Sequence, residues 1–343
     1  MKNDDRSSAL FFSMTYEFLE VYLPKQCGRS SHTVESYRDA LSLFRRYIVD
    51  TVGISIGKFT FAECTRECIL GFMDYLSRLH SKSSTRNQRL AALKSYLSFA
   101  ADKDITLQSI ELQVKRIPQC RVPKTEKTVI GEDAMSAILQ QPANTRLGLR
   151  DRTIMILLYD SGARLAEVLN LNVSDVAIDG NSPYIRVNGK GSKQRIVPIS
   201  VKTAAHIARY LSVYHSNKQT DSLLLFFTVI KDVTARISEG NVERFVREYA
   251  TKARSLCPSV PDHVHPHMFR RTRATQLYQN GVSLPLVSRL LGHASLETTQ
   301  LYAKPSLKML RAAIESVEPP YQKAVKAIWE GDENAMARLS GLR

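Results

Sequence analysis

The stretch HPHMFRRTR, residues 265–273, sets alternating histidines beside a cluster of arginines. Pro266 is favourable in the first turn of a helix, so we expect a helix to begin there. His267 and Arg270 are three residues apart and would share one face of that helix. Such a face places a hydrogen-bonding or proton-transfer group beside a guanidinium that can hold an anion through two parallel hydrogen bonds.

The same stretch raises the question of a metal site. His263, His265 and His267 alternate, and imidazole is a common metal ligand. Pro266 interrupts the alternation. We therefore expect no metal, and a metal-dependent nuclease stays an alternative that activity in excess chelator would exclude.

Two further motifs precede this stretch. In GARLAE, residues 162–167, Arg164 follows a glycine break at the start of an expected helix, and Glu167 lies one turn later. Taken alone, this motif is more often a helix start with an ordinary local ion pair. Lys190 stands between two glycines in the turn of a β-hairpin predicted for residues 184–198. Alone, a lysine in a turn indicates little.

A fourth motif, LLGHASLETTQLY at residues 290–302, follows the stretch 265–273. Ser295 and Glu297 are typical of an N-cap and an acidic first turn, so His293 would lie at the positive end of a helix. A phosphate is stabilised at such a position. Tyr302 comes two turns later and, alone, would be a packed amphipathic tyrosine.

The composition favours a polyanionic partner. The 343 residues include 48 Lys and Arg against 33 Asp and Glu, a net charge of +15 that is shared by both halves of the chain. No apolar run approaches the roughly 20 residues that cross a bilayer, and no signal peptide is recognisable. Five scattered cysteines suit a reducing compartment. We expect a cytoplasmic protein without a membrane partner.

The periodicity predicts a mainly α protein with a small antiparallel β-sheet. Apolar residues recur at helical spacing over residues 11–101, which indicates a bundle of at least four helices. Residues 114–128 contain two prolines and five basic residues and are predicted to be an extended linker. The expected division is a helical domain over residues 1–113, a linker over 114–128, a second domain over 129–305 that holds the motifs, and a C-terminal helical segment over 306–343.

Taken together, the motifs resemble those of the tyrosine recombinase, or phage integrase, superfamily. Its catalytic domain carries an arginine, a hairpin lysine, His-x-x-Arg, Gly-His and a nucleophilic tyrosine, in that order. The matching residues here are Arg164, Lys190, His267, Arg270, His293 and Tyr302. The stretch from Ser31 to Leu41 resembles the family's core-binding domain. Arg271 departs from the pattern, since relatives often carry histidine there.

The resemblance implies a SAM-like core-binding bundle, an α+β catalytic domain and a role for each matching residue. Arg164 and Arg270 would neutralise the phosphate, with His293 donating to the same oxygens. His267 would accept the phenolic proton or hold the phosphate, and Lys190 would protonate the departing 5′ oxygen. Tyr302 would form a covalent 3′-phosphotyrosine, which conserves the bond energy. Glu167 would orient the Arg164 region, and no metal, nucleotide or other cofactor is expected.

The implied partner is a double-stranded recombination site, bound by a dimer per site and a synaptic tetramer, with a possible sister recombinase or accessory protein. Candidate DNA-contact residues lie on the helix predicted for 85–96 and in the linker: Arg86, Asn87, Arg89, Lys94, Lys115, Arg116 and Arg121. Residues 306–343 would dock on a neighbouring protomer or pack on their own domain. The protein would associate with the nucleoid when bound to DNA.

Two other activities remain open at the level of sequence. A type IB topoisomerase uses the same chemistry but reseals the same strand. A DNA-binding regulator without catalysis would not need Tyr302. The sequence also leaves open whether a recombinase would serve transposition or another mobile element, phage integration, an integron, or resolution of chromosome dimers.

Overall fold

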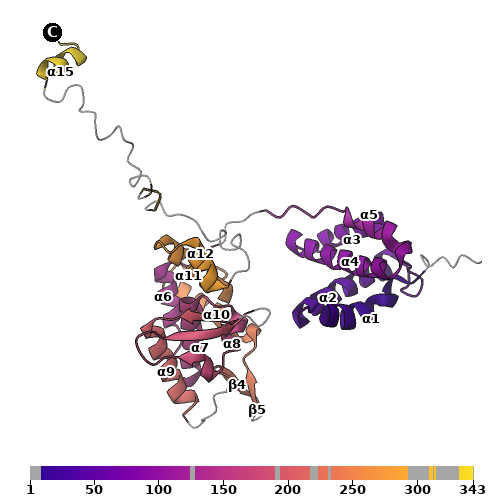
Figure 1. Cartoon of the computed structure of the whole chain (residues 1–343), viewed down its shortest axis with the longest axis horizontal. Helices are drawn as coiled ribbons and strands as arrows, with labels where there is room; N and C mark the ends of the chain where they lie inside the picture. Colours follow the sequence, from indigo (N-terminus) through magenta and orange to yellow (C-terminus); the bar gives the residue numbers. More distant parts are fainter. Residues whose placement is uncertain are drawn as a thin grey trace, which may run out of the picture. The chain divides into compact units, whose positions relative to one another are not determined.

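The computed structural model describes residues 9–123, 128–189, 194–216, 223–230, 233–292, 309–311, 313 and 332–342. The chain divides into two compact units, Met1–Glu126 and Lys127–Arg343, and each is considered by itself (Figure 1). Both units are mostly helical, as the periodicity predicts.

The first unit is a bundle of helices, drawn in indigo to purple in Figure 1. The short helix α1 continues into a π-helical segment, and α2 ends in a similar one. The elements are α1 (Thr15–Glu17), its continuation Phe18–Gln26, α2 (Ser31–Tyr47), its continuation Ile48–Val52, α3 (Arg66–Arg78), α4 (Ser83–Lys103) and α5 (Gln108–Lys115).

Local capping and an aromatic core explain this bundle. The side chain of Ser30 accepts a hydrogen bond from the Thr33 amide at the start of α2 and so caps the helix. The core is rich in aromatic rings that meet edge to face, a preferred arrangement. Phe11, Phe44 and Tyr96 are fully or almost fully buried in it.

The predicted linker, residues 114–128, begins later than expected. Helix α5 runs to Lys115, and the side chains of Val114 and Ile117 are buried in the core of the first unit. These two apolar residues lie one helical turn apart, a signal that the surrounding prolines and basic residues concealed. The first unit therefore extends beyond residue 113, the predicted end of the first domain.

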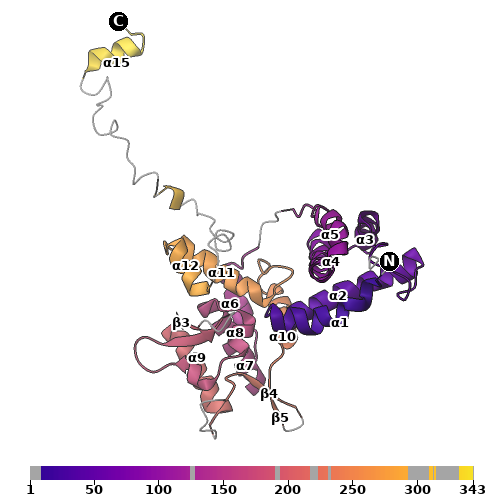
Figure 2. The same ribbon diagram turned by 45° about the vertical axis from the view of Figure 1, so that its right-hand side comes forward.

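The second unit packs helices around α7, which lies against α9 and α11 (Figure 2). Helix α11 begins at Pro266, as the first motif predicts. The helices of this unit are α6 (Glu132–Gln140), α7 (Arg146–Ser161), α8 (Leu165–Leu169), α9 (Val201–Tyr214), α10 (Glu239–Arg254), α11 (Pro266–Gln279), α12 (Leu284–Leu291) and α15 (Glu333–Leu339).

Two small antiparallel sheets accompany these helices. The first has the order β1 (Val176–Ala177), β2 (Tyr184–Asn188), β3 (Gln194–Pro198), and its β2–β3 pair is the predicted hairpin. The second, β4 (Phe227–Ile230) with β5 (Val233–Arg236), was not predicted. Its first strand ends a long apolar run, which periodicity alone does not assign to a strand.

The register of β2 with β3 places an arginine on the inner face of the sheet. Ile185 pairs with Val197, and Val187 pairs with Arg195. Because side chains alternate along a strand, Arg195 lies on the same face as these three buried aliphatic residues. A charged side chain at such a position needs partners, and they are found at the site described below.

The C-terminal segment is described only in part. Helix α15 is short, and most of the helical segment predicted for residues 306–343 lies outside the described residues. Across the part of the chain that the structure describes, no helix is long and apolar enough to cross a membrane.

Candidate active site

A pocket of about 300 Å³ brings together the residues of two sequence motifs. Arg164 comes from the start of α8, while His267 and Arg270 come from the first turns of α11. Glu239 and Glu243 of α10 also line this pocket. The two motifs lie about a hundred residues apart in sequence, so the fold rather than local spacing creates this site.

Arg164 is placed by a sharp end to the preceding helix. Gly162 ends α7 in the left-handed conformation, with φ of 60°, and Arg164 becomes the N-cap of α8. The Arg164 amide donates to Glu167 Oε2 at 2.8 Å, and its Nη1 donates to Glu167 Oε1 at 2.9 Å. The Arg164 side chain keeps 45% of its surface exposed, so its guanidinium is accessible from solvent.

Arg270 is held much more deeply. Its exposed fraction is 2%, and its two terminal nitrogens donate to the carbonyls of Gly162 and Leu291, each at 2.8 Å. This arginine therefore ties the end of α7 to the end of α12 while it lines the pocket. The sequence predicts that Arg270 binds a phosphate. It does not predict that the Arg270 side chain also holds two backbone segments together.

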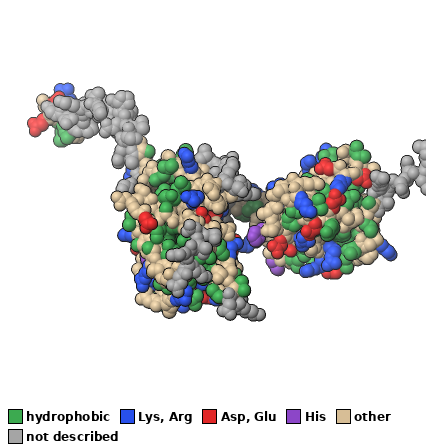
Figure 3. All heavy atoms as spheres, turned by 60° about the horizontal axis from the view of Figure 1, so that its bottom comes forward, with side chains coloured by type: hydrophobic (Ala, Val, Ile, Leu, Met, Phe, Trp, Pro, Cys, Tyr) green, Lys and Arg blue, Asp and Glu red, His purple; other side chains and the backbone are tan. Residues whose placement is uncertain are grey.

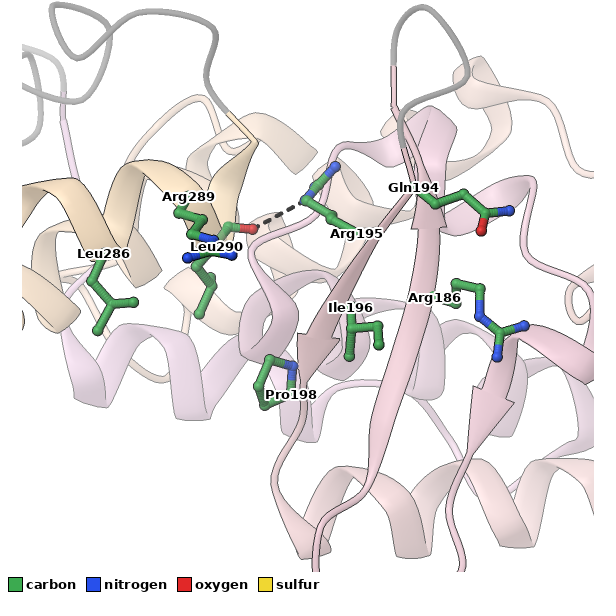
Figure 4. Close-up of a pocket in the computed structure, with 8 residues that line it drawn as sticks. All are labelled: Arg186, Gln194, Arg195, Ile196, Pro198, Leu286, Arg289 and Leu290. Carbon is green, nitrogen blue, oxygen red and sulfur yellow. Dashed lines mark hydrogen bonds between the residues drawn. The ribbon is translucent and has the colours of Figure 1, made fainter.

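The C-terminal end of α12 is capped by three arginines from three different elements. Nε of Arg195 donates to the Leu290 carbonyl at 3.1 Å, as Figure 4 shows. Arg270 donates to the Leu291 carbonyl, and Nη2 of Arg164 to the Gly292 carbonyl at 3.3 Å. The last carbonyls of a helix lack helical partners and carry partial negative charge, so cations are stabilised there.

Glu167 joins two of these arginines. Its exposed fraction is 7%, and besides Arg164 it accepts two hydrogen bonds from Arg195, Nη1 to Oε1 at 2.9 Å and Nη2 to Oε2 at 2.7 Å. Burial by itself raises the pKa of the Glu167 carboxyl. Hydrogen bonds from Arg195 and from the Arg164 amide outweigh burial and hold the pKa below its ordinary value. The carboxylate is therefore charged at neutral pH.

Sequence reasoning missed Arg195. The available signal was its alternation with Ile196 and Val197 in β3, which puts an arginine on the buried face of the hairpin. Arg195 also borders a second, larger pocket of about 660 Å³ between β3 and α12, together with Arg186 and Arg289 (Figure 4). Ile196, on the opposite face of the strand, is 62% exposed.

Three predicted catalytic residues, Lys190, His293 and Tyr302, lie outside the described residues. The described chain stops beside two of them, at Gly189 after β2 and at Gly292 after α12. Their roles, like those of Arg164, His267 and Arg270, stay predictions.

The histidines form no metal centre among the residues that are described, since no group of three potential ligands comes together there. The rings of His265 and His267 are nearly parallel, with centroids 6.4 Å apart. Partial burial and the nearby Arg271 lower the pKa of His265, while Glu243 acts in the opposite direction. A neutral His265 is thereby favoured at the edge of the pocket.

The predicted DNA-contact residues on α4 have intramolecular partners. Asn87 donates to the Cys120 carbonyl and accepts from the Cys120 amide, both at 2.8 Å. Lys94 donates to the carbonyls of Lys115 and Ile117, and partial burial lowers its pKa. Asn87 and Lys94 thus hold the segment after α5 against α4, a task that sequence reasoning did not foresee.

The other DNA-contact candidates are more available. Arg86 and Arg89 donate to the hydroxyls of the nearby Ser83 and Ser81, respectively. Lys115, at the end of α5, is exposed and pairs with Glu111 at 3.3 Å, and Arg116 and Arg121 are exposed after the helix. Figure 3 shows Lys and Arg side chains on the visible surface of both units, interspersed with acidic ones. Contact with DNA stays a prediction for all seven residues.

Comparison with known proteins identifies two family regions. Residues 128–308, more than half of the chain, match the phage integrase family. Residues 17–104 match the N-terminal SAM-like domain of phage integrases. These regions correspond to the two units of the structure.

Individual relatives that match most of the chain are tyrosine recombinases. Tyrosine recombinase XerC of Myxococcus xanthus is 31% identical over 88% of this chain and 97% of its own length. Tyrosine recombinase XerA of Pyrococcus horikoshii is 30% identical over 85% of this chain and 89% of its own.

Solved structures share the fold at lower identity. The recombinase XerH bound to its difH substrate has a TM-score of 0.63 at 21% identity, covering 88% of this chain and 84% of that one. A Tn1549 transposon integrase bound to transposon right-end DNA has a TM-score of 0.64 at 15% identity, covering 88% and 98%. With the family matches, the relatives and the shared fold in agreement, this chain belongs to the phage integrase family of tyrosine recombinases.

Proposed function

We propose that this protein is a site-specific DNA recombinase that cuts and rejoins strands through a covalent 3′-phosphotyrosine. The observation that carries the proposal is the convergence of Arg164, His267 and Arg270 in one pocket. Two of these residues are permanently charged and suit a phosphodiester. The third is a histidine, the side chain that most often transfers protons near neutral pH.

The reaction that suits this site is an in-line displacement at phosphorus. The Tyr302 oxygen forms a bond to phosphorus and gives up its proton, with His267 as the acceptor in the pocket. The bond to the 5′ oxygen breaks, and Lys190 supplies the proton that this oxygen takes up. Arg164 and Arg270 stabilise the charge that develops on the non-bridging oxygens. Attack by a different 5′ hydroxyl reverses these steps and exchanges strands.

The proposed partner is a duplex recombination site bound by a dimer, with two such complexes forming a tetramer. Two observations support it: the net charge of +15, and the DNA complexes of the structural neighbours, among them a lambda integrase dimer on a core site. A protein with this substrate would be found at the nucleoid. The C-terminal residues 306–343 would dock on a neighbouring protomer, and a sister recombinase or an accessory protein remains a possible further partner.

The experiment that tests the proposal is covalent trapping. The protein is incubated in chelator with duplexes taken from both sides of its own gene, and with a pool of nicked duplexes of random sequence. DNA that stays attached in detergent is sequenced, and the attached residue is identified by mass spectrometry. We expect attachment at Tyr302, and Tyr302→Phe should abolish it while DNA affinity changes less than a few-fold.

The outcomes separate the alternatives. An adduct that persists in Tyr302→Phe would contradict the nucleophile assignment. DNA binding by the wild-type protein without an adduct in either DNA set would favour a regulator without catalysis. Exchange of strands between two labelled duplexes supports recombination, whereas resealing of the same strand alone would indicate topoisomerase-like activity.

A further inference from the structure

The arginines at the candidate site are not equivalent in their surroundings. Arg164 is 45% exposed over its side chain, whereas Arg195 is 15% exposed. Both are paired with the same buried carboxylate, Glu167. Two positive charges thus share one negative charge, and the more exposed of the two belongs to the pocket that holds His267 and Arg270.

Arg195 makes the fuller pair with Glu167. It donates to both carboxylate oxygens with two nitrogens, the parallel geometry in which a guanidinium and a carboxylate interact most strongly. Arg164 reaches only Oε1 with its side chain, and its contact with Oε2 comes from the backbone amide. Arg195, the less exposed of the two arginines, therefore supplies most of the side-chain compensation for the charge of Glu167.

Arg195 also contacts the C-terminal end of α12, which borders the site. Its Nε donates to the Leu290 carbonyl, and its guanidinium lies against Gly292. A Cβ built on Gly292 would lie 2.9 Å from Arg195 Cζ, so a side chain at this position would displace the guanidinium. One side chain thus links β3, the first turn of α8 and the end of α12.

We propose that Arg195 is a positioning residue for DNA cleavage, which neutralises Glu167 so that the charge of Arg164 is available to the scissile phosphate. Without Arg195, a buried and uncompensated carboxylate would draw the Arg164 guanidinium into a tight pair of its own. The phosphate would then face a weaker positive field. This inference rests on the proposed function and adds to it a residue outside the family motif.

The test compares two substrates. One is the duplex that the trapping experiment recovers, and the other is the same duplex with one non-bridging oxygen of the scissile phosphate replaced by a methyl group. The methylphosphonate carries no negative charge, so it needs less stabilisation from Arg164. We expect Arg195→Gln to slow single-turnover cleavage of the ordinary duplex about 100-fold, the scale of a small misplacement of a catalytic group. On the methylphosphonate the loss should be less than about tenfold.

Arg254→Gln is the matched control. Arg254 also caps backbone carbonyls, those of Val260 and Pro261, in the same unit but away from the pocket. It reports what the loss of a half-buried, carbonyl-binding arginine does to stability alone. We expect it to cleave both substrates at the wild-type rate at a temperature where all variants are folded. Arg164→Ala is the reference for loss of the phosphate-facing charge and should show the same substrate dependence as Arg195→Gln.

Arg195→Lys keeps the test decisive should the glutamine variant not fold. A lysine retains the charge but cannot bind both carboxylate oxygens and a carbonyl together. We expect an intermediate loss, about tenfold on the ordinary duplex and less on the methylphosphonate. Equal losses on both substrates, or cleavage at the rate of Arg254→Gln, would overturn the positioning role. Absence of cleavage by the wild-type protein would instead contradict the proposed function, so the two failures are distinguishable.

Discussion

Asn87 forms both halves of a backbone-like pair with Cys120, because its amide group donates to the Cys120 carbonyl and accepts from the Cys120 amide, each at 2.8 Å. The Asn87 side chain thus makes the two backbone hydrogen bonds that a neighbouring strand would otherwise make to Cys120. The exposed cations Lys115, Arg116 and Arg121 lie on or close to that segment. Asn87 thus links α4 to the residues that the sequence assigned to DNA contact.

Asn87→Ala should release this segment from α4. Loss of two partly buried hydrogen bonds costs about 1–2 kcal/mol of local stability. Hydrogen exchange followed by mass spectrometry should therefore show protection of the Cys120 amide reduced about tenfold or more. Gln88→Ala is the matched control, since Gln88 donates to the exposed hydroxyl of Ser36. Unchanged protection at Cys120 in Asn87→Ala would show that other contacts hold the segment.

Gly292→Ala should cost more stability than Gly281→Ala. Both glycines have positive φ, 66° and 85°, so either alanine incurs a conformational cost of about 1–2 kcal/mol. Only at Gly292 would the new methyl group collide, with the Arg195 guanidinium at 2.9 Å; at Gly281 no atom lies within 4 Å. Urea unfolding of the two variants should differ by about 1 kcal/mol or more. Equal losses would mean that Arg195 can move aside freely.

Sequence and structure agree best where a single helix or hairpin carries the motif. The start of α11 at Pro266 and the β2–β3 hairpin both follow from local patterns. The contact between Arg164 and Glu167 is likewise local, three residues apart on the first turn of α8. Short-range rules suffice for such features because the interacting groups are adjacent in the chain.

The sequence could not show which partners distant residues choose. Arg270 was expected to face a phosphate, yet its terminal nitrogens reach the carbonyls of Gly162 and Leu291, from two other parts of the fold. Arg195 was read only as a residue of a strand, although its burial depends on the packing of α8 and α12 against the sheet. In these contacts the charge of an arginine is compensated by groups that are distant in sequence. The periodicity of polar and apolar residues does not show which groups these are.

Acidification should destabilise the protein through His206 of α9. Burial lowers the pKa of His206, and the nearby Arg152 and Arg209 lower it further. The folded state therefore binds a proton less readily than the unfolded state does. Stability from this group is fully present above the ordinary histidine pKa of about 6.5 and is lost as the pH falls toward the lower, folded value.

Urea midpoints at pH 8 and at pH 5.5 measure this effect. His206→Gln cannot titrate, so the difference between its two midpoints should be smaller than that of the wild-type protein. Arg209→Gln removes one of the nearby cations and should also reduce the difference. Identical pH dependence in wild type and His206→Gln would show that His206 titrates alike in both states.

Chelator should leave cleavage unchanged. Divalent metals in nucleases supply positive charge to the phosphate, and here Arg164 and Arg270 can supply it from the protein. The remaining route to a metal runs through the alternating histidines at 263, 265 and 267, which would need a further ligand from outside the described residues. Yields of the Tyr302 adduct in excess EDTA and in added magnesium should agree within a factor of two. A yield that collapses in EDTA and returns with metal would favour metal-dependent chemistry. His263→Ala would then be the variant to compare, because cleavage that relies on Arg164 and Arg270 does not depend on His263.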